Sequence, residues 1–138
     1  MSEKEKAPRP KRILVVDDDR IIQRNISVKL KDKGYQVVTA LEASQALSAL
    51  RQNKPDLILL DINFPPDVAH GGGVGWDGIG ILEWFQRVDA AKSIPVIIIS
   101  GTDPAKCEDR VKAIGAVAFF QKPIDHAELH AAIQKHLG

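Results

Sequence analysis

Four apolar stretches of this 138-residue sequence lead into side chains that can do chemistry. Aspartates occupy residues 17–19 after one stretch, and Asp61 closes a second. Ser100 closes a third stretch, and Lys122 follows a fourth. Carboxylates gathered in one pocket repel each other, and a hard divalent cation such as Mg²⁺ would compensate that repulsion. With an amine, a hydroxyl and a carboxylate nucleophile, such a site would suit the handling of a phosphoryl group.

The elements that carry these side chains are expected to be short parallel strands alternating with helices. Five apolar runs lack the alternation of a half-exposed strand, which indicates cover on both faces. They are residues 12–16, 36–40, 56–60, 95–100 and 116–121. Amphipathic patterns predict helices over 20–34, 41–53, 78–88, 103–115 and 125–138. This order predicts an α/β fold, a (βα)₅ doubly wound, five-stranded parallel sheet of flavodoxin-like type with strand order 2-1-3-4-5.

That strand order brings the reactive side chains together. Functional groups of an open α/β sheet gather beyond the carboxyl ends of its strands. The first, third and fourth strands are neighbours in the order 2-1-3-4-5, and they end near Asp17, Asp61 and Ser100. The fifth strand is next and precedes Lys122. We therefore expect one site that four different strands supply.

Composition limits the possible partners and location. A formal net charge of +1 gives no bulk attraction to nucleic acid or to an acidic membrane surface, so neither is expected as a direct partner. Residues 1–11 are charged, contain prolines and lack an apolar signal segment, so we expect a disordered tail before one domain over 12–138. Cys107 is the single cysteine, which fits a reducing compartment, and a cytoplasmic location is expected.

Taken together, the motifs resemble the receiver domain of two-component response regulators, of the chemotaxis-regulator type. The resemblance rests on ILVVDDD at 13–19, PDLILLDIN at 55–63, PVIIISG at 95–101 and FFQKPI at 119–124. It implies a signalling module that takes a phosphoryl group from a phosphohistidine of a sensor histidine kinase or a histidine phosphotransfer protein. It also implies a change of conformation that controls a downstream protein. Such a domain is not an enzyme beyond catalysing its own phosphorylation and dephosphorylation.

The resemblance implies an acceptor and a metal site. Asp61 would be the phospho-acceptor. Mg²⁺ would be the cofactor, held by Asp18, Asp61 and the backbone carbonyl of Asn63, while Asp17 would act through water.

The resemblance also implies a phosphate partner and a switch. Lys122 would pair with the phosphoryl oxygens and would precede a cis bond to Pro123. Ser100 would bond the phosphoryl group, and Phe119 would move with it, without the hydroxyl that a tyrosine would bring. The downstream protein is expected at the face of the fourth helix, fifth strand and fifth helix. Both a monomer and a phosphorylation-dependent homodimer stay open.

The glycine-rich stretch over 64–77 runs into GVGWDG at 73–78, which formally matches G-x-G-x-x-G. The glycines do not follow a strand directly, and no acid stands about 20 residues later, so a dinucleotide site is not expected. The resemblance makes the stretch a loop with about nine extra residues, which cost little stability. Its role as a mobile flap or as an inert insertion stays open.

Two other signals favour structural interpretations. His126 and His130 stand four residues apart on a predicted helix, but no third zinc ligand accompanies them, which favours an exposed helix face. Asp19 is more typical of a helix N-cap than of a metal ligand.

Two alternative functions remain. One is a receiver-like binding module that is not phosphorylated, which loss of signalling in an Asp61→Asn variant would contradict. The other is a small phosphatase, because the D-x-D of residues 17–19 resembles haloacid-dehalogenase-like enzymes. Asp17 would then be the nucleophile, but the chain is short for that fold and Asp61 would go unexplained.

Overall fold

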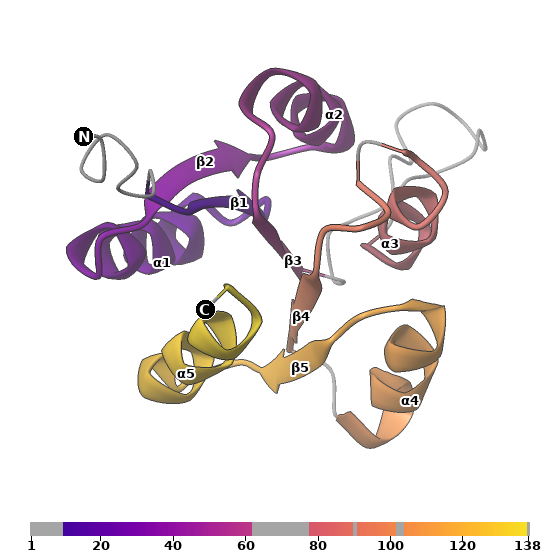
Figure 1. The fold of residues 1–138 in the computed structure, drawn as a ribbon. Helices are drawn as coiled ribbons and strands as arrows, with labels where there is room; N and C mark the ends of the chain where they lie inside the picture. The colour runs from indigo at the N-terminus through magenta and orange to yellow at the C-terminus, as the bar shows by residue number, and fades with distance from the viewer. Residues whose placement is uncertain (1–9, 62–77, 90, 102–103, 138) are drawn as a thin grey trace.

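The computed structural model describes residues 10–61, 78–89, 91–101 and 104–137. Strands and helices alternate along these residues, as Figure 1 shows. The expected tail over 1–11 lies mostly outside the described residues. Asn63 and the glycine-rich stretch over 64–77 lie wholly outside them.

The strands form one parallel sheet. They are β1 (Arg12–Val16), β2 (Gln36–Ala40), β3 (Leu57–Asp61), β4 (Val96–Ser100) and β5 (Ala118–Gln121). Every pairing is parallel and the order is β2-β1-β3-β4-β5, so the predicted fold class and strand order are confirmed. Asp61 is itself the last residue of β3, one residue beyond the predicted strand.

The helices lie close to their predicted positions. They are α1 (Arg20–Asp32), α2 (Ala43–Asn53), α3 (Gly78–Phe85), α4 (Pro104–Ile114) and α5 (His126–Leu137). None of the helices in the described residues is long and apolar enough to cross a bilayer.

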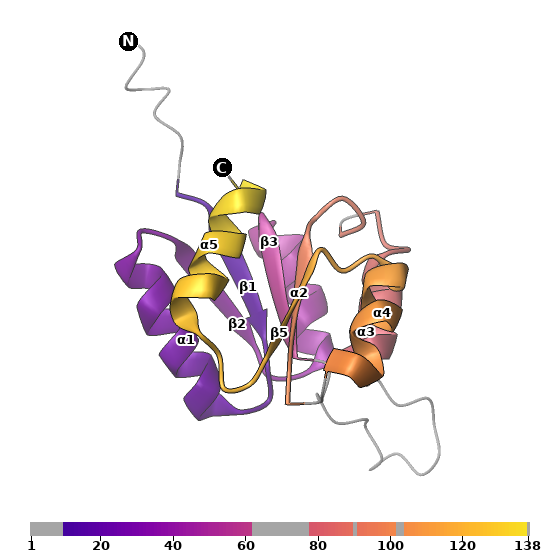
Figure 2. The ribbon, with the colours of Figure 1, turned by 90° about the horizontal axis from the view of Figure 1, so that it is seen from below.

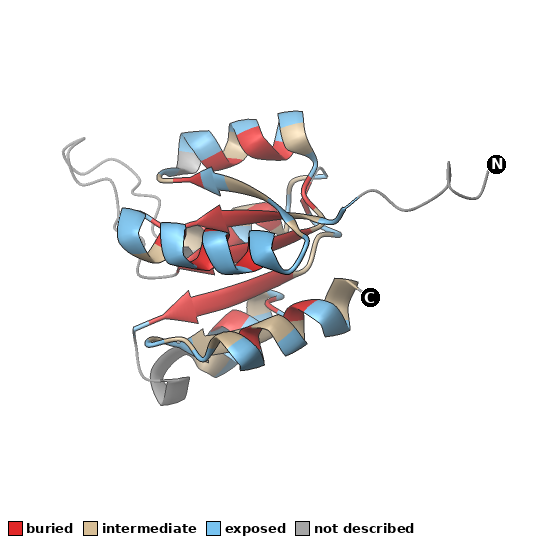
Figure 3. Ribbon diagram, turned by 90° about the vertical axis from the view of Figure 1, so that its left-hand side faces the viewer, coloured by how far each residue is buried: buried red, intermediate tan, exposed pale blue. Residues whose placement is uncertain are grey.

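Helices cover both faces of the sheet, which explains why the central strands are apolar without alternation. Figure 2 shows α1 and α5 together on one face, and α3 and α4 on the other. Strand residues alternate between the two layers, so that Leu14 packs on the side of α2, α3 and α4 and Ile13 on the side of α1 and α5. Every residue of β3 and β4 is buried (Figure 3). This burial fixes the ends of the central strands, where the reactive residues stand.

Helix ends follow local rules. Gly34 has a φ of +96°, and its N–H donates to the Lys31 carbonyl at 3.0 Å, while Tyr35 N–H donates to Leu30 at 3.1 Å. This Schellman arrangement is the predicted stop of α1. The α3 helix ends at Phe85, three residues before the predicted end. The carbonyl of Trp84 accepts both the N–H of Arg87, three residues later, at 2.9 Å and that of Val88 at 3.1 Å, so the helix ends in a tighter turn.

Candidate functional site

The carboxyl edge of the sheet gathers the predicted side chains. Asp17 directly follows β1, Asp61 ends β3, Ser100 ends β4, and Lys122 directly follows β5. In the register, Asp61 lies beside Ile99, one residue before Ser100. Ser100 lies beside Gln121, one residue before Lys122. Regular parallel pairing is therefore enough to bring the four residues to one place.

Three carboxylates meet at this edge. Asp17, Asp18 and Asp61 each offer an oxygen, and these oxygens lie within 4.8 Å of one another. Asp17 and Asp61 are buried, with 2% and 4% of their surface exposed, whereas Asp18 is exposed. Clustered carboxylate oxygens that are open to solvent on one side are the donor set that Mg²⁺ prefers. The described residues of the site therefore fit this ion.

Lys122 is the cation of the site. Its Nζ lies 3.3 Å from Asp61 Oδ2 and 3.5 Å from Asp17 Oδ2. Its side chain is only 20% exposed, so both ion pairs are shielded from water. The peptide bond from Lys122 to Pro123 is cis, as the resemblance implied. The site thus holds one amine, which pairs with two carboxylates, and a third carboxylate beside them, and a bound cation would offset the repulsion among the three.

Asp17 bears the electrostatic cost of this crowding. Burial raises the pKa of its carboxyl from 3.8 to about 6, and repulsion from Asp61 also raises it. The bond from the backbone N–H of Asp19, together with the charge of Lys122, lowers the pKa, but these effects are weaker than the rise. In metal-free protein the charged form of Asp17 is therefore unfavourable, and a cation beside it would lower the pKa.

Gln23 anchors the backbone of this acidic turn. Its buried amide donates to the carbonyl of Asp17 at 3.2 Å and to that of Ala40 at 3.0 Å, with a longer contact of 3.5 Å to Val15. The Ala40 carbonyl also accepts the N–H of Asp17 at 3.1 Å. Gln23 thus joins α1 to the ends of β1 and β2.

The sequence interpretation missed Gln23, although a signal existed. Gln23, Ile26 and Leu30 stand at i, i+3 and i+7, the spacing of one buried helix face, and all three are buried.

Asp19 caps α1, as predicted. Its Oδ1 accepts the N–H of Ile21 at 2.9 Å and that of Ile22 at 3.2 Å. Its own N–H donates to Asp17 Oδ1 at 2.9 Å. The third aspartate of the run therefore orients the first and starts the helix.

Ser100 and Phe119 stand on neighbouring strands. Ser100 is fully buried at the end of β4, and its carbonyl accepts the N–H of Lys122 at 2.8 Å. Phe119 is half-buried on β5, lies beside Ile98 in the register and packs against the cluster on the side of α2, α3 and α4. Because side chains alternate along a strand, Ile98 and Ser100 share a sheet face. Phe119 pairs with Ile98 in the register, so Ser100 and Phe119 lie near each other on one side of the sheet.

The sequence matches the model of the family described as response regulator receiver domain over residues 13–134. It is 33% identical over 126 residues to sporulation initiation phosphotransferase F of Bacillus subtilis, which covers 91% of this chain and 93% of that protein. It is 27% identical to the polar-differentiation response regulator DivK of Brucella anthropi, covering 94% of this chain and 98% of that protein.

Solved structures agree with these sequence matches. The chemotaxis response regulator CheY4 of Vibrio cholerae has a TM-score of 0.77 at 27% identity, covering 93% of this chain and 99% of that one. The receiver domain of NtrX from Brucella abortus has a TM-score of 0.78 at 30% identity, covering 91% and 97%. The likeness therefore extends over nearly the whole length of both partners in each comparison.

Proposed function

The chain belongs to the response regulator receiver domain family, and from that premise we propose that Asp61 accepts the phosphoryl group. The receiver domain would span residues 12–138. The observation that carries the proposal is the setting of Asp61. It is buried at the end of β3, bonded to Lys122 at 3.3 Å and grouped with two more aspartates. Burial of a carboxylate at the end of an apolar strand costs free energy, and a role of that carboxylate in phosphoryl transfer would explain its presence there.

The transfer would start from a phosphohistidine of a sensor histidine kinase or a histidine phosphotransfer protein. An Asp61 carboxylate oxygen attacks phosphorus, the new P–O bond gives an acyl phosphate, and the P–N bond breaks. The electron pair of that bond stays on the imidazole. Burial favours this chemistry because a carboxylate with little surrounding water is a better nucleophile and its acyl phosphate is shielded from hydrolysis.

A Mg²⁺ ion, when bound, would neutralise charge on the phosphoryl oxygens during transfer. Asp18 and Asp61 would be its carboxylate ligands, the Asn63 carbonyl would be another, and Asp17 would contribute through water. Asp18 is exposed and can present its carboxylate to an ion arriving from solvent. Asp17 is buried and held by the N–H of Asp19, which fixes the direction of its carboxylate.

Lys122 would pair with the phosphoryl oxygens once they arrive. Its amine now bonds the Asp61 and Asp17 carboxylates, so it stands within a few ångströms of the incoming group. A lysine amine is a compact point charge and suits a phosphate oxygen. Phosphorylation would therefore exchange a carboxylate partner of Lys122 for a phosphoryl one.

Ser100 and Phe119 would couple the bound phosphoryl group to a change of conformation. The Ser100 hydroxyl would bond a phosphoryl oxygen, and the space near the end of β4 would then favour an inward position of the Phe119 ring. Phe119 has no hydroxyl, so this coupling would rest on packing alone. Phosphorylation would shift a pre-existing equilibrium between two conformations.

Receivers of this family work with histidine kinases or phosphotransfer proteins on one side and effectors on the other. For this chain we place the downstream protein at the face of α4, β5 and α5, in the cytoplasm. The protein would act as a monomer or as a phosphorylation-dependent homodimer. It would turn over no substrate other than its own phosphoryl group.

The proposal is tested by the intact mass of the protein after incubation with acetyl phosphate. We expect a gain of one phosphoryl group with Mg²⁺ and none after chelation. Asp61→Asn should gain nothing, and the matched control Asp19→Asn, which keeps an N-capping oxygen, should gain one group. Labelling of Asp61→Asn equal to that of wild type would contradict the proposal.

A further inference from the structure

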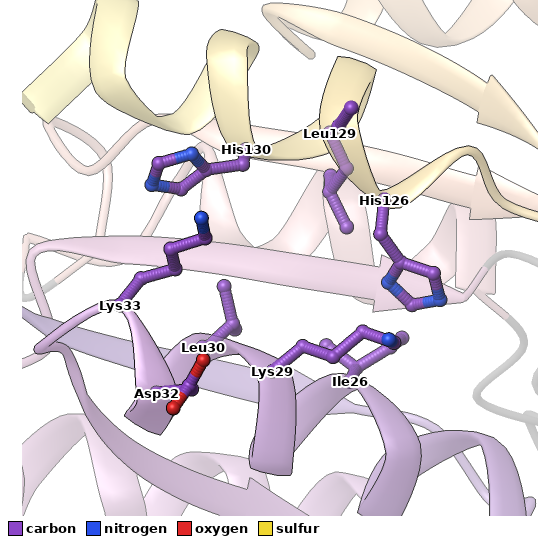
Figure 4. Close-up of a pocket in the computed structure, with 9 residues that line it drawn as sticks. Ile26, Lys29, Leu30, Asp32, Lys33, His126, Leu129 and His130 are labelled. Carbon is purple, nitrogen blue, oxygen red and sulfur yellow. The ribbon is translucent and has the colours of Figure 1, made fainter.

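A cleft lies between α1 and α5, on the side of the sheet where these two helices pack together. Its volume is about 350 Å³, within the range of small-molecule sites. Figure 4 shows the side chains that line it from both helices. They are Ile26, Lys29, Leu30, Asp32, Lys33, His126, Ala127, Leu129 and His130.

The floor of the cleft is apolar and fixed. Ile26 and Leu30 from α1 and Leu129 from α5 belong to the buried core cluster on this face. These side chains are held by core packing and are only 1%, 4% and 2% exposed, so they close the bottom of the cleft. The surface that a ligand with an apolar body would meet comes from the exposed Ala127, the aliphatic stems of Lys29 and Lys33 and the half-buried imidazoles.

The rim of the cleft is basic from both sides. In Figure 4 the amine of Lys33 extends toward His130, and that of Lys29 extends toward His126. The ring of His130 also contacts Tyr35 edge-on, with ring centroids 6.0 Å apart, which orients it. Asp32 is the sole carboxylate among the lining residues. Two amines and two imidazoles thus surround one apolar floor.

These charges disfavour one another. Burial lowers the pKa of His126, and the nearby charge of Lys29 lowers it further, while Asp125 raises it. Favourable interaction with the helix dipole accounts for basic residues in the last turn of α1, which include Lys29 and Lys31. It does not account for two imidazoles placed opposite the lysines on another helix. Lys31 stands on the same turn and does not line the cleft.

We propose that the cleft between α1 and α5 binds a small organic anion with an apolar body, such as an aromatic carboxylate. The apolar part would lie against Ala127 and the aliphatic stems of the two lysines, and the carboxylate would bond the amines of Lys29 and Lys33. The site is separate from the phosphorylation site, and its occupant is an anion of the cell rather than the phosphoryl donor.

Binding depends on pH through the histidines. Burial and the charge of Lys29 lower the pKa of His126, so it loses its proton more readily than a free histidine and gains charge as the pH falls. The charged groups facing it are Lys29 from α1 and Asp125 from its own helix start, with Lys33, His130 and Asp32 around the cleft. A bound carboxylate favours the protonated imidazole. Affinity therefore rises as the pH falls, and the bound anion in turn raises the pKa of His126.

The test uses 2-naphthoate as the probe and NMR of the full chain labelled with ¹⁵N as the readout. We expect shift changes at α1 and α5 residues that line the cleft, and binding roughly tenfold weaker for the uncharged 2-naphthalenemethanol. The double variant Lys29→Gln/Lys33→Gln should lose the preference for the carboxylate, and the control Lys31→Gln should keep it. The His126 pKa, followed by its imidazole resonances, should rise when 2-naphthoate is added to wild type.

Three results would overturn the proposal. They are absence of saturable binding, equal affinity for the acid and the alcohol, and shift changes that map away from the cleft. Asp61→Asn should bind 2-naphthoate as wild type does, so a failure of this inference is distinguishable from a failure of the proposed phosphorylation.

Discussion

Replacement of Asp17 by asparagine is expected to stabilise the protein in the absence of divalent cations. Burial raises the pKa of Asp17 to about 6, so the folded protein disfavours its charge even with Lys122 Nζ at 3.5 Å. An asparagine keeps a side-chain oxygen that can accept the Asp19 N–H bond, and it carries no charge. The variant should therefore hold the same local structure without the electrostatic penalty.

The size of the gain follows from the pKa. A rise from 3.8 to about 6 is about two units, or about 3 kcal/mol at 1.36 kcal/mol per unit. Solvent reaches the site beside the exposed Asp18 and screens the charges, so we expect about 1 to 2 kcal/mol.

The sign of the pH dependence is fixed by the direction of the shift. Between about pH 4 and pH 6 the folded protein holds a proton that the unfolded chain has released, so the free energy of unfolding falls as the pH rises. Above about pH 6 the full cost of the buried Asp17 charge lowers the free energy of unfolding. Below about pH 4 Asp17 is protonated in both the folded and the unfolded state, so this cost is absent. The advantage of Asp17→Asn should therefore grow through this window and then level off.

Urea unfolding with a chelator, across this pH range, measures the effect. Asp109→Asn serves as the control because it removes the same charge from an exposed position on α4. Added Mg²⁺ should stabilise wild type more than Asp17→Asn, because the variant keeps the other two carboxylates of the site but lacks the charge of Asp17. An Asp17→Asn variant no more stable than wild type near neutral pH, or a gain independent of pH, would refute the reasoning.

Three further predictions concern neighbouring residues. Gln23→Leu removes the side-chain donor to the Asp17 and Ala40 carbonyls, so we expect a loss of about 1 to 3 kcal/mol in urea unfolding and weaker Mg²⁺ binding. Magnesium affinity equal to that of wild type would limit Gln23 to a structural role. Asp19→Ala removes the N-cap of α1 and should cost about 1 kcal/mol in thermal unfolding. Labelling by acetyl phosphate should survive in that variant, and its loss would contradict a capping role. Lys122→Gln should slow labelling by acetyl phosphate roughly tenfold or more at saturating Mg²⁺, because a preorganised charge is lost; an unchanged rate, measured by mass, would argue against a role in transfer.

Much of the fold could be predicted because the strongest signals are local. Leu57–Leu60 and residues 96–99 are uninterrupted apolar runs, and both are buried on each face of the sheet. Gly34 ended α1 where predicted because its φ of +96° is strained for other residues. The order of strands followed from the parallel topology, which also determined that Asp61 and Lys122 would meet.

Features that depend on tertiary contacts were not predictable in the same way. Val88 continues the apolar spacing of α3, but a residue packed against the core can stand in a helix or in the turn after it, and here it stands in the turn. Gln23 is polar, and only the carbonyls at the ends of β1 and β2 make its burial favourable. His126 and His130 were placed correctly on α5, whereas their position opposite Lys29 and Lys33 results from the packing of α1 against α5.

The most direct test of the central claim is to locate the phosphoryl group. Protein labelled by acetyl phosphate and Mg²⁺ is reduced with borohydride, which converts a phosphoaspartate to homoserine, and is then digested and sequenced by mass spectrometry. The account predicts homoserine at position 61 alone. Homoserine at position 17 in place of position 61 would instead support the phosphatase mechanism and would contradict the assignment of Asp61 as the acceptor.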